Sequence, residues 1–211
     1  MRIMLKLKYY IDKLMKDNDI FISIGANDGM FVDEIFQFKL LNDKWKCFFI
    51  EPVRKTFDKL IENYTKHYPN NDFTYINKAI NTYCGSGILV TLKRDDSYGM
   101  CSFSRPEDDN TVRIQVDCIT IKKLIEDYES INNIDFLKID AEGMDSEIII
   151  QFLDLNIFPK IILFEHIGQN GKARSYSEVL EKIKNTYTVI KDSIDIDYEK
   201  YNILLIKNQY V

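Results

Sequence analysis

Short apolar runs rich in β-branched residues alternate along the chain with stretches whose apolar residues recur at helical spacing. This alternation is typical of a mostly parallel sheet wrapped by helices. The runs predict five strands in sequence order, over residues 20–24, 46–50, 73–76, 136–139 and 160–164.

Helical spacing predicts the elements between these strands. A short amphipathic helix is expected within residues 1–19, and further helices end at residue 41 or cover residues 119–129 and 176–184. The stretch 53–64 is also helical, with one apolar face formed by Val53, Phe57, Leu60 and Ile61.

Two last apolar runs, residues 187–191 and 201–207, are separated only by a short polar segment. A parallel neighbour would need a crossover of about a dozen residues, so these runs predict an antiparallel hairpin. We therefore expect one domain over residues 1–211 with a Rossmann-like α/β fold. Its sheet would be seven-stranded and mostly parallel, with a terminal antiparallel hairpin and helices on both faces.

Residues 85–116 break the alternation with two apolar runs joined by a polar turn. This pattern predicts an inserted antiparallel segment, and segments of this kind commonly cover an active site. Tyr98, Ser102 and Arg105 lie within it and are expected to shape the pocket for a substrate.

Composition and charge exclude several classes of function. The net charge is −5, which argues against a general nucleic-acid binder. No apolar run suits a signal peptide or a membrane span, so we expect a cytoplasmic protein with no membrane partner. The four cysteines are scattered, form no zinc-binding pattern and are expected to be reduced. They are Cys47, Cys84, Cys101 and Cys118.

The first strand runs into a turn within the sequence FISIGANDG. Such a turn approaches a ligand closely when its residues lack bulk or tolerate left-handed dihedral angles. Gly25 and Gly29 do both, and Asn27 tolerates left-handed dihedral angles. The dinucleotide template G-x-G-x-x-G fails at Asn27 and Met30. A methyltransferase pattern of an acid and three alternate glycines is matched in position by Ser23, Gly25, Asn27 and Gly29. Alone, this turn is equally compatible with a plain connection between strand and helix.

Glu51 follows the second predicted strand. A carboxylate at this place can accept hydrogen bonds from both hydroxyls of a ribose that lies across the first turn. A glutamate by itself is more often a surface residue, so the combination with the glycine turn is what favours a ligand role.

The segment FLKIDAEG carries the third group of polar residues. Strand alternation places Phe136, Lys138 and Asp140 on one side, and Asp140 and Glu142 then emerge at the carboxyl edge of the sheet. If this strand neighbours the first, both carboxylates line the crevice where ligands bind in such folds. The structural alternative is that Asp140 caps the following helix and Glu142 favours its amino end.

Taken in order, FISIGANDG, FFIEP, NKAI, FLKIDAEG and IILFEH resemble the FkbM-type methyltransferases over residues 21–166. The resemblance implies S-adenosylmethionine as cofactor and O-methyl transfer to a hydroxyl of a sugar, a glycan or a related small molecule. It implies a cofactor site formed by Ser23, Gly25, Ala26, Asn27, Gly29, Glu51, Pro52 and Asp140, with the adenine beside Ala79 and Ile80. Ser23 replaces the usual acid of the first motif, so a charge that helps to hold a cationic cofactor is missing.

Methyl transfer from a sulfonium requires mainly alignment and a base for the hydroxyl. The candidate bases are Asp140, Glu142 and His166, and Lys138 would pair with Asp140 or with the cofactor's carboxylate. Carboxylates at Asp140, Glu142 and Glu165 also suit a divalent cation, but our prediction includes no metal. Two alternatives are a nicotinamide-type oxidoreductase and a non-catalytic Rossmann-like domain in a glycan-related assembly.

Overall fold

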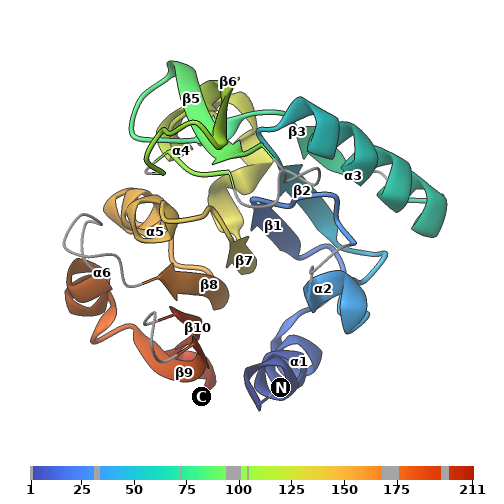
Figure 1. Ribbon diagram of the computed structural model, residues 1–211. Helices are drawn as coiled ribbons and strands as arrows, with labels where there is room; N and C mark the ends of the chain where they lie inside the picture. Colours follow the sequence, from blue (N-terminus) through green and yellow to red (C-terminus); the bar gives the residue numbers. More distant parts are fainter. Residues whose placement is uncertain are drawn as a thin grey trace.

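The computed structural model of the chain describes residues 2–30, 34–71, 73–93, 101–103, 105–167, 176–195 and 200–211. Its main sheet has the strand order β3-β2-β1-β7-β8-β10-β9 (Figure 1). These strands are β1 (Ile20–Ile24), β2 (Lys46–Ile50), β3 (Thr74–Ile76), β7 (Phe136–Ile139), β8 (Ile161–Ile167), β9 (Tyr187–Asp195) and β10 (Lys200–Lys207).

Strands β1, β2, β3, β7 and β8 run parallel to one another, whereas β10 is antiparallel to both β8 and β9. The predicted seven-stranded, mostly parallel sheet with a terminal hairpin is therefore confirmed. Strands β1 and β7 are parallel neighbours, so the glycine turn after β1 and the acids after β7 lie side by side at the carboxyl edge of the sheet. A doubly wound strand order requires this arrangement.

Helices cover both faces of this sheet, as predicted (Figure 1). One face carries α1 (Arg2–Leu14), α2 (Glu34–Gln37) and α3 (Arg54–His67), and the other carries α4 (Ile121–Asp127), α5 (Asp145–Asp154) and α6 (Tyr176–Ile183). The short 3₁₀ helices η1 (Glu129–Asn133) and η2 (Asn208–Tyr210) complete the helices of the described residues.

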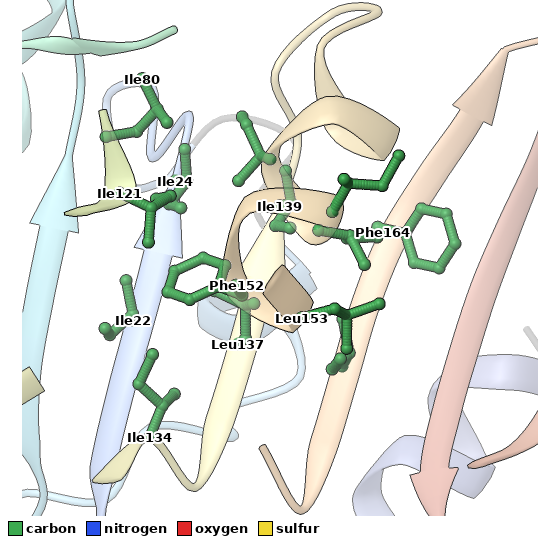
Figure 2. Packing of buried hydrophobic residues seen from close by; sticks show 14 of the residues in the cluster. Ile22, Ile24, Ile80, Ile121, Ile134, Leu137, Ile139, Phe152, Leu153 and Phe164 are labelled. Atoms are coloured by element: carbon green, nitrogen blue, oxygen red, sulfur yellow. The ribbon is translucent and has the colours of Figure 1, made fainter. Parts of the chain in front are cut away.

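Strands β1 and β7 are buried on both sides because each side is covered by helices, and their residues are apolar apart from Ser23 and Lys138. On the side of α5, aliphatic residues of β1 and β7 meet the helix, and Figure 2 shows Ile22 and Leu137 beside Phe152. On the opposite side the packing is aromatic, with the rings of Phe21 and Phe136 stacked at a centroid distance of 4.8 Å. Full burial of each such side chain stabilises the fold by about 1.5–3 kcal/mol.

A second, smaller sheet consists of β4 (Ala79–Ile80), β5 (Gly85–Leu92) and β6 (Thr111–Ile119). Strands β5 and β6 pair antiparallel within the region where the sequence predicts an antiparallel excursion. Strand β4 pairs parallel with β6. The sequence does not predict β4, because two residues are too few to show an alternation of apolar and polar positions.

Several predicted helix boundaries are wrong, and the hydrogen bonds explain two of them. The helix expected to end at residue 41 ends at Gln37, since Lys39 adopts a left-handed conformation (φ 51°) and Leu40 N–H bonds back to the Ile35 carbonyl at 2.8 Å. The helix expected from residue 119 begins at Ile121, because the Thr120 hydroxyl oxygen accepts a hydrogen bond from Lys123 N–H and caps it.

Strand β8 extends to Ile167, three residues beyond its predicted end. The extension is paired throughout with β10, where Glu165 stands opposite Asn202 and His166 opposite Tyr201. Glu165 and His166 therefore lie within a ladder rather than after it.

The amino ends of three strands are joined by one cation. Lys160 Nζ lies 2.8 Å from a carboxylate oxygen of Asp19 and 2.9 Å from one of Asp135, and all three side chains are largely buried. This cluster holds the start of β1, β7 and β8 at the edge of the sheet opposite to the carboxyl ends.

All four cysteines are free thiols. Among the described residues, no helix has the length and apolar character needed to cross a membrane.

Candidate active site

A pocket of about 640 Å³, counting the part that is open to solvent, lies at the carboxyl ends of β1, β2 and β7. The small sheet and the 101–103 segment form its opposite wall. Its lining combines a few polar groups with a mostly apolar surface: Ile24, Gly25, Asn27, Ile50, Glu51, Pro52, Val53, Lys78, Ala79, Ile80, Leu89, Cys101, Phe103, Asp140, Ala141, Glu142 and Met144.

The glycine turn has the left-handed conformations that its sequence predicts. Gly25, Asn27 and Gly29 have φ angles of 73°, 51° and 73°. The N–H groups of Gly25 and Ala26 both donate to the Ile50 carbonyl, at 2.9 and 3.0 Å, so the turn is fixed to the end of β2. A β-carbon on Gly29 would lie 2.6 Å from Leu60, which shows how closely the turn packs on α3.

Glu51 is the buried carboxylate of the pocket, with 6% of its surface exposed. One carboxylate oxygen accepts a hydrogen bond from Asn27 N–H at 3.0 Å, and the other accepts one from Val53 N–H at 2.9 Å. Burial raises the pKa of Glu51 to about 7, although these two hydrogen bonds act in the opposite direction. Its remaining acceptor capacity can serve a ligand in the pocket.

Asn77 supports Glu51 and was not singled out from the sequence. Its side-chain amide donates to the carbonyl oxygens of Glu51 and Pro52, at 2.8 and 3.0 Å. Asn77 follows β3 directly, so its position after a strand at the ligand-binding edge was a usable signal.

Asp140 and Glu142 line the other end of the pocket, as predicted. Asp140 stands at the end of β7, where its N–H donates to the Ile24 carbonyl at 2.9 Å. Lys138 Nζ lies 3.8 Å from an Asp140 carboxylate oxygen, which agrees with the predicted pairing of these two side chains. The Lys138 side chain is only 4% exposed and is not part of the pocket lining.

The alternative role of Asp140 as a helix cap is wrong. The residue before α5 is Met144, and it makes no side-chain capping bond. Instead, Asp145 in the first turn of α5 accepts hydrogen bonds from Ala141 N–H and Gly143 N–H, at 3.4 and 3.2 Å. Burial and the charge of Asp140 raise the pKa of Asp145 to about 8. Asp145 was not singled out from the sequence, because an acid at a helix start usually serves only the helix.

The structure thus brings Gly25, Asn27, Glu51, Pro52, Ala79, Ile80, Asp140 and Glu142 together around one pocket. Four predicted site residues do not line it: Ser23, Ala26, Gly29 and Lys138. Ser23 is buried under the turn, and its hydroxyl has no hydrogen-bond partner within the described part of the chain. The side chain of His166 and the whole of Tyr98 lie outside the described residues.

The inserted segment reaches this pocket through residues 101–103. Cys101 and Phe103 line the pocket, and the hydroxyl of Ser102 donates to the Glu142 carbonyl at 2.8 Å. Arg105 is partly buried and does not line the pocket. Within the described ranges, no group of three or more His, Cys, Asp or Glu side chains is placed to hold a metal ion.

The pocket wall has a small apolar core of its own, which we call the wall cluster. It is separate from the two cores on the faces of the main sheet. Its buried members are Val53, Ala79, Leu89, Val116 and Cys118. Val53 was predicted on the apolar face of the helix over 53–64, but it precedes α3 and packs into the wall cluster instead.

This strand order, with a glycine turn facing a buried glutamate across a pocket at the carboxyl edge, defines a class I methyltransferase. The fold is similar to a candidate rRNA methylase from Clostridium thermocellum (TM-score 0.56, 14% identity, 96% of this chain and 94% of that chain). It is also similar to an rRNA methylase from Streptococcus thermophilus (TM-score 0.55, 9% identity, coverage 96% and 95%). A third similar structure is fibrillarin from Aeropyrum pernix, solved with bound S-adenosyl-L-methionine (TM-score 0.52, 10% identity, coverage 97% and 73%).

At these identities the similar structures establish the fold alone. No curated protein matches the chain by sequence. The methyltransferase FkbM domain, however, matches residues 23–189, which is most of the chain. The chain therefore belongs to the FkbM methyltransferase family and is an S-adenosylmethionine-dependent methyltransferase.

Proposed function

We propose that the protein transfers a methyl group to a hydroxyl of a sugar, a glycan or a related small molecule. One observation carries this proposal: the glycine turn, Glu51 and the acids after β7 converge on one pocket. When bound there, S-adenosylmethionine would supply a methyl group on a good leaving group, its sulfonium sulfur, for displacement by the acceptor oxygen.

The residues present fit this cofactor. Glu51 offers a buried carboxylate to the two ribose hydroxyls, and its two backbone hydrogen bonds fix the direction of the carboxylate. Ala79 and Ile80 are both buried at the pocket wall and offer an apolar surface for an adenine ring. The Gly25 turn lets the backbone come close to the rest of the molecule without obstruction by side chains.

Asp140 is the proposed base. Its side chain is 42% exposed, so it is accessible from the pocket, and Lys138 Nζ lies 3.8 Å from one of its carboxylate oxygens. Asp140 would accept the proton that the hydroxyl loses as its oxygen is methylated, with Glu142 as the neighbouring second candidate. His166 stays a prediction as a third candidate.

The acceptor is proposed to be small and the protein cytoplasmic. Two similar folds belong to proteins described as rRNA methylases, but a net charge of −5 disfavours a phosphate-rich acceptor. An RNA acceptor is therefore the outcome that the assay must be able to detect.

The test is a methyl-transfer assay with labelled S-adenosylmethionine against sugars, sugar nucleotides and total RNA. We expect label in the hydroxyl compounds, a weakened cofactor affinity in Glu51→Ala, and a lowered turnover with retained cofactor affinity in Asp140→Asn. Asp108→Asn, a substitution in an exposed turn away from the pocket, is the matched control. Equal activity in all variants contradicts the site, and label only in RNA contradicts the acceptor class.

A further inference from the structure

The loop over residues 140–143 has a conformation that its sequence does not favour. Glu142 has a φ angle of 48° and Gly143 one of 102°. A left-handed conformation is natural for glycine but is conformationally unfavourable for a residue such as glutamate. Interactions around Glu142 must therefore hold the loop, and Glu142 lines the pocket.

The first such interaction comes from Asp145, which is 4% exposed. Its two carboxylate oxygens accept hydrogen bonds from Ala141 N–H and Gly143 N–H, the amides on either side of Glu142. Two convergent N–H donors need two acceptors, and an aspartate offers both at a length that a glutamate would exceed. Asp145 thus fixes the loop from the side of α5.

The second interaction comes from the opposite side of the loop. Ser102 is 8% exposed, and its hydroxyl donates to the Glu142 carbonyl at 2.8 Å. Ser102 is itself fixed, because its N–H and carbonyl exchange two hydrogen bonds with Val90 of β5, at 3.1 and 3.0 Å. Its neighbours Cys101 and Phe103 line the pocket.

We propose that Asp145 and Ser102 are paired positioning residues, which hold the Glu142 peptide between them and join the 101–103 wall of the pocket to the 140–143 loop. Neither side chain is proposed to touch the cofactor or the acceptor. The orientation of Glu142 and the position of the 101–103 wall then depend on each other, so loss of either Asp145 or Ser102 weakens both. The inference rests on the proposed function only in taking this pocket as the cofactor site.

The test combines two measurements on the full chain. Hydrogen exchange reports on the amides of residues 141–143, and calorimetry measures the Kd for S-adenosylhomocysteine. We expect Ser102→Ala to speed exchange at Gly143, although that amide is not bonded to Ser102, and to raise the Kd about five- to tenfold. Ser102→Thr, which keeps the hydroxyl, should restore the Kd to within about twofold of the parent value.

Asp145→Ala should give a similar rise in Kd, and Asp145→Asn, which keeps one acceptor and the volume, a smaller one. In the double variant Ser102→Ala/Asp145→Ala the rise should equal that of one substitution rather than the product of both. Ser86→Ala and Asp108→Ala are matched controls, since the hydrogen bonds of both residues are exposed and neither residue lines the pocket. Both controls should leave the exchange at 141–143 and the Kd unchanged.

Multiplicative effects in the double variant overturn the pairing. A lowered melting temperature with an unchanged Kd overturns the positioning role and leaves a purely structural one. If the parent protein does not bind S-adenosylhomocysteine at all, the proposed function fails. The hydrogen exchange data then test the pairing of Asp145 and Ser102 without the ligand. Unchanged exchange at Gly143 in Ser102→Ala contradicts the pairing, and faster exchange supports it.

Discussion

The backbone of Gly25 passes against the carbonyl group of Asp140 so closely that a β-carbon on Gly25 would lie 1.9 Å from that oxygen. This contact brings the turn after β1 and the end of β7 together, and it leaves no space for a side chain. The two halves of the pocket are thus in direct backbone contact.

We expect Gly25→Ala to be among the most disruptive single substitutions in the chain. It adds this clash to a left-handed φ angle of 73°, and we expect a loss of at least about 2 kcal/mol of unfolding free energy. Chemical denaturation measures the loss. Gly85→Ala is the control, because Gly85 also has a positive φ angle but no atom lies within 4 Å of its added β-carbon. A loss no larger than that of the control would show that the contact with Asp140 can relax.

Glu51 makes the stability of the fold depend on pH. Its folded-state pKa of about 7 lies above the ordinary value of 4.5, so the folded protein binds the proton more tightly than the unfolded chain does. The contribution of Glu51 to stability is therefore complete below about pH 4.5 and is lost as the pH rises through about 7. Asp145, with a pKa of about 8, acts in the same direction.

Glu51→Gln should remove this dependence. Between about pH 5 and pH 9 the variant should lose less unfolding free energy than the parent protein, by an amount of the order of 1–3 kcal/mol. Denaturation at a series of pH values measures the difference. Parallel pH profiles for variant and parent would contradict the raised pKa.

Ser23 provides a test of charge at the cofactor site. Its hydroxyl is buried without a hydrogen-bond partner in the described part of the chain, so Ser23→Ala should change the unfolding free energy by less than about 1 kcal/mol. Ser23→Asp places a carboxylate opposite Lys138 on the neighbouring strand. We expect this variant to bind cationic S-adenosylmethionine more tightly relative to neutral S-adenosylhomocysteine. Calorimetry with both ligands decides, and an unchanged ratio of the two Kd values would contradict the electrostatic argument.

Lys160 tests the opposite edge of the sheet. Lys160→Met leaves the carboxylates of Asp19 and Asp135 largely buried without their shared cation, and we expect a loss of about 2–4 kcal/mol of unfolding free energy. Lys184→Met breaks an exposed pair with Glu181 and should cost about 0.5 kcal/mol or less. Equal losses of unfolding free energy in the two variants would show that burial of the Lys160 cluster does not increase its contribution to stability.

The sequence predicts the fold well where local signals agree. β-Branched runs give the seven strands of the main sheet, and the left-handed Asn27 is predictable because asparagine tolerates that conformation. Boundaries are less predictable, since the end of α2 depends on a non-glycine residue, Lys39, in a left-handed conformation.

The site is only partly predictable for a different reason. Glu51 and Asp140 follow strands directly, so their convergence follows from strand order alone. Asp145 and Ser102 act through backbone groups of the 140–143 loop, and such contacts depend on a tertiary arrangement that no spacing in the sequence encodes. The extent of β8 likewise depends on pairing with β10, a strand that comes much later in the chain.

The wall cluster is independent of the two cores that stabilise the main sheet. A replacement of Leu89, which lines the pocket, by another apolar residue therefore reshapes the cavity while the layers of the sheet keep their own contacts. Evolution can in this way change the shape of the cavity without first finding a compensating change elsewhere. The same separation makes the wall cluster the natural place at which to engineer the shape of the pocket.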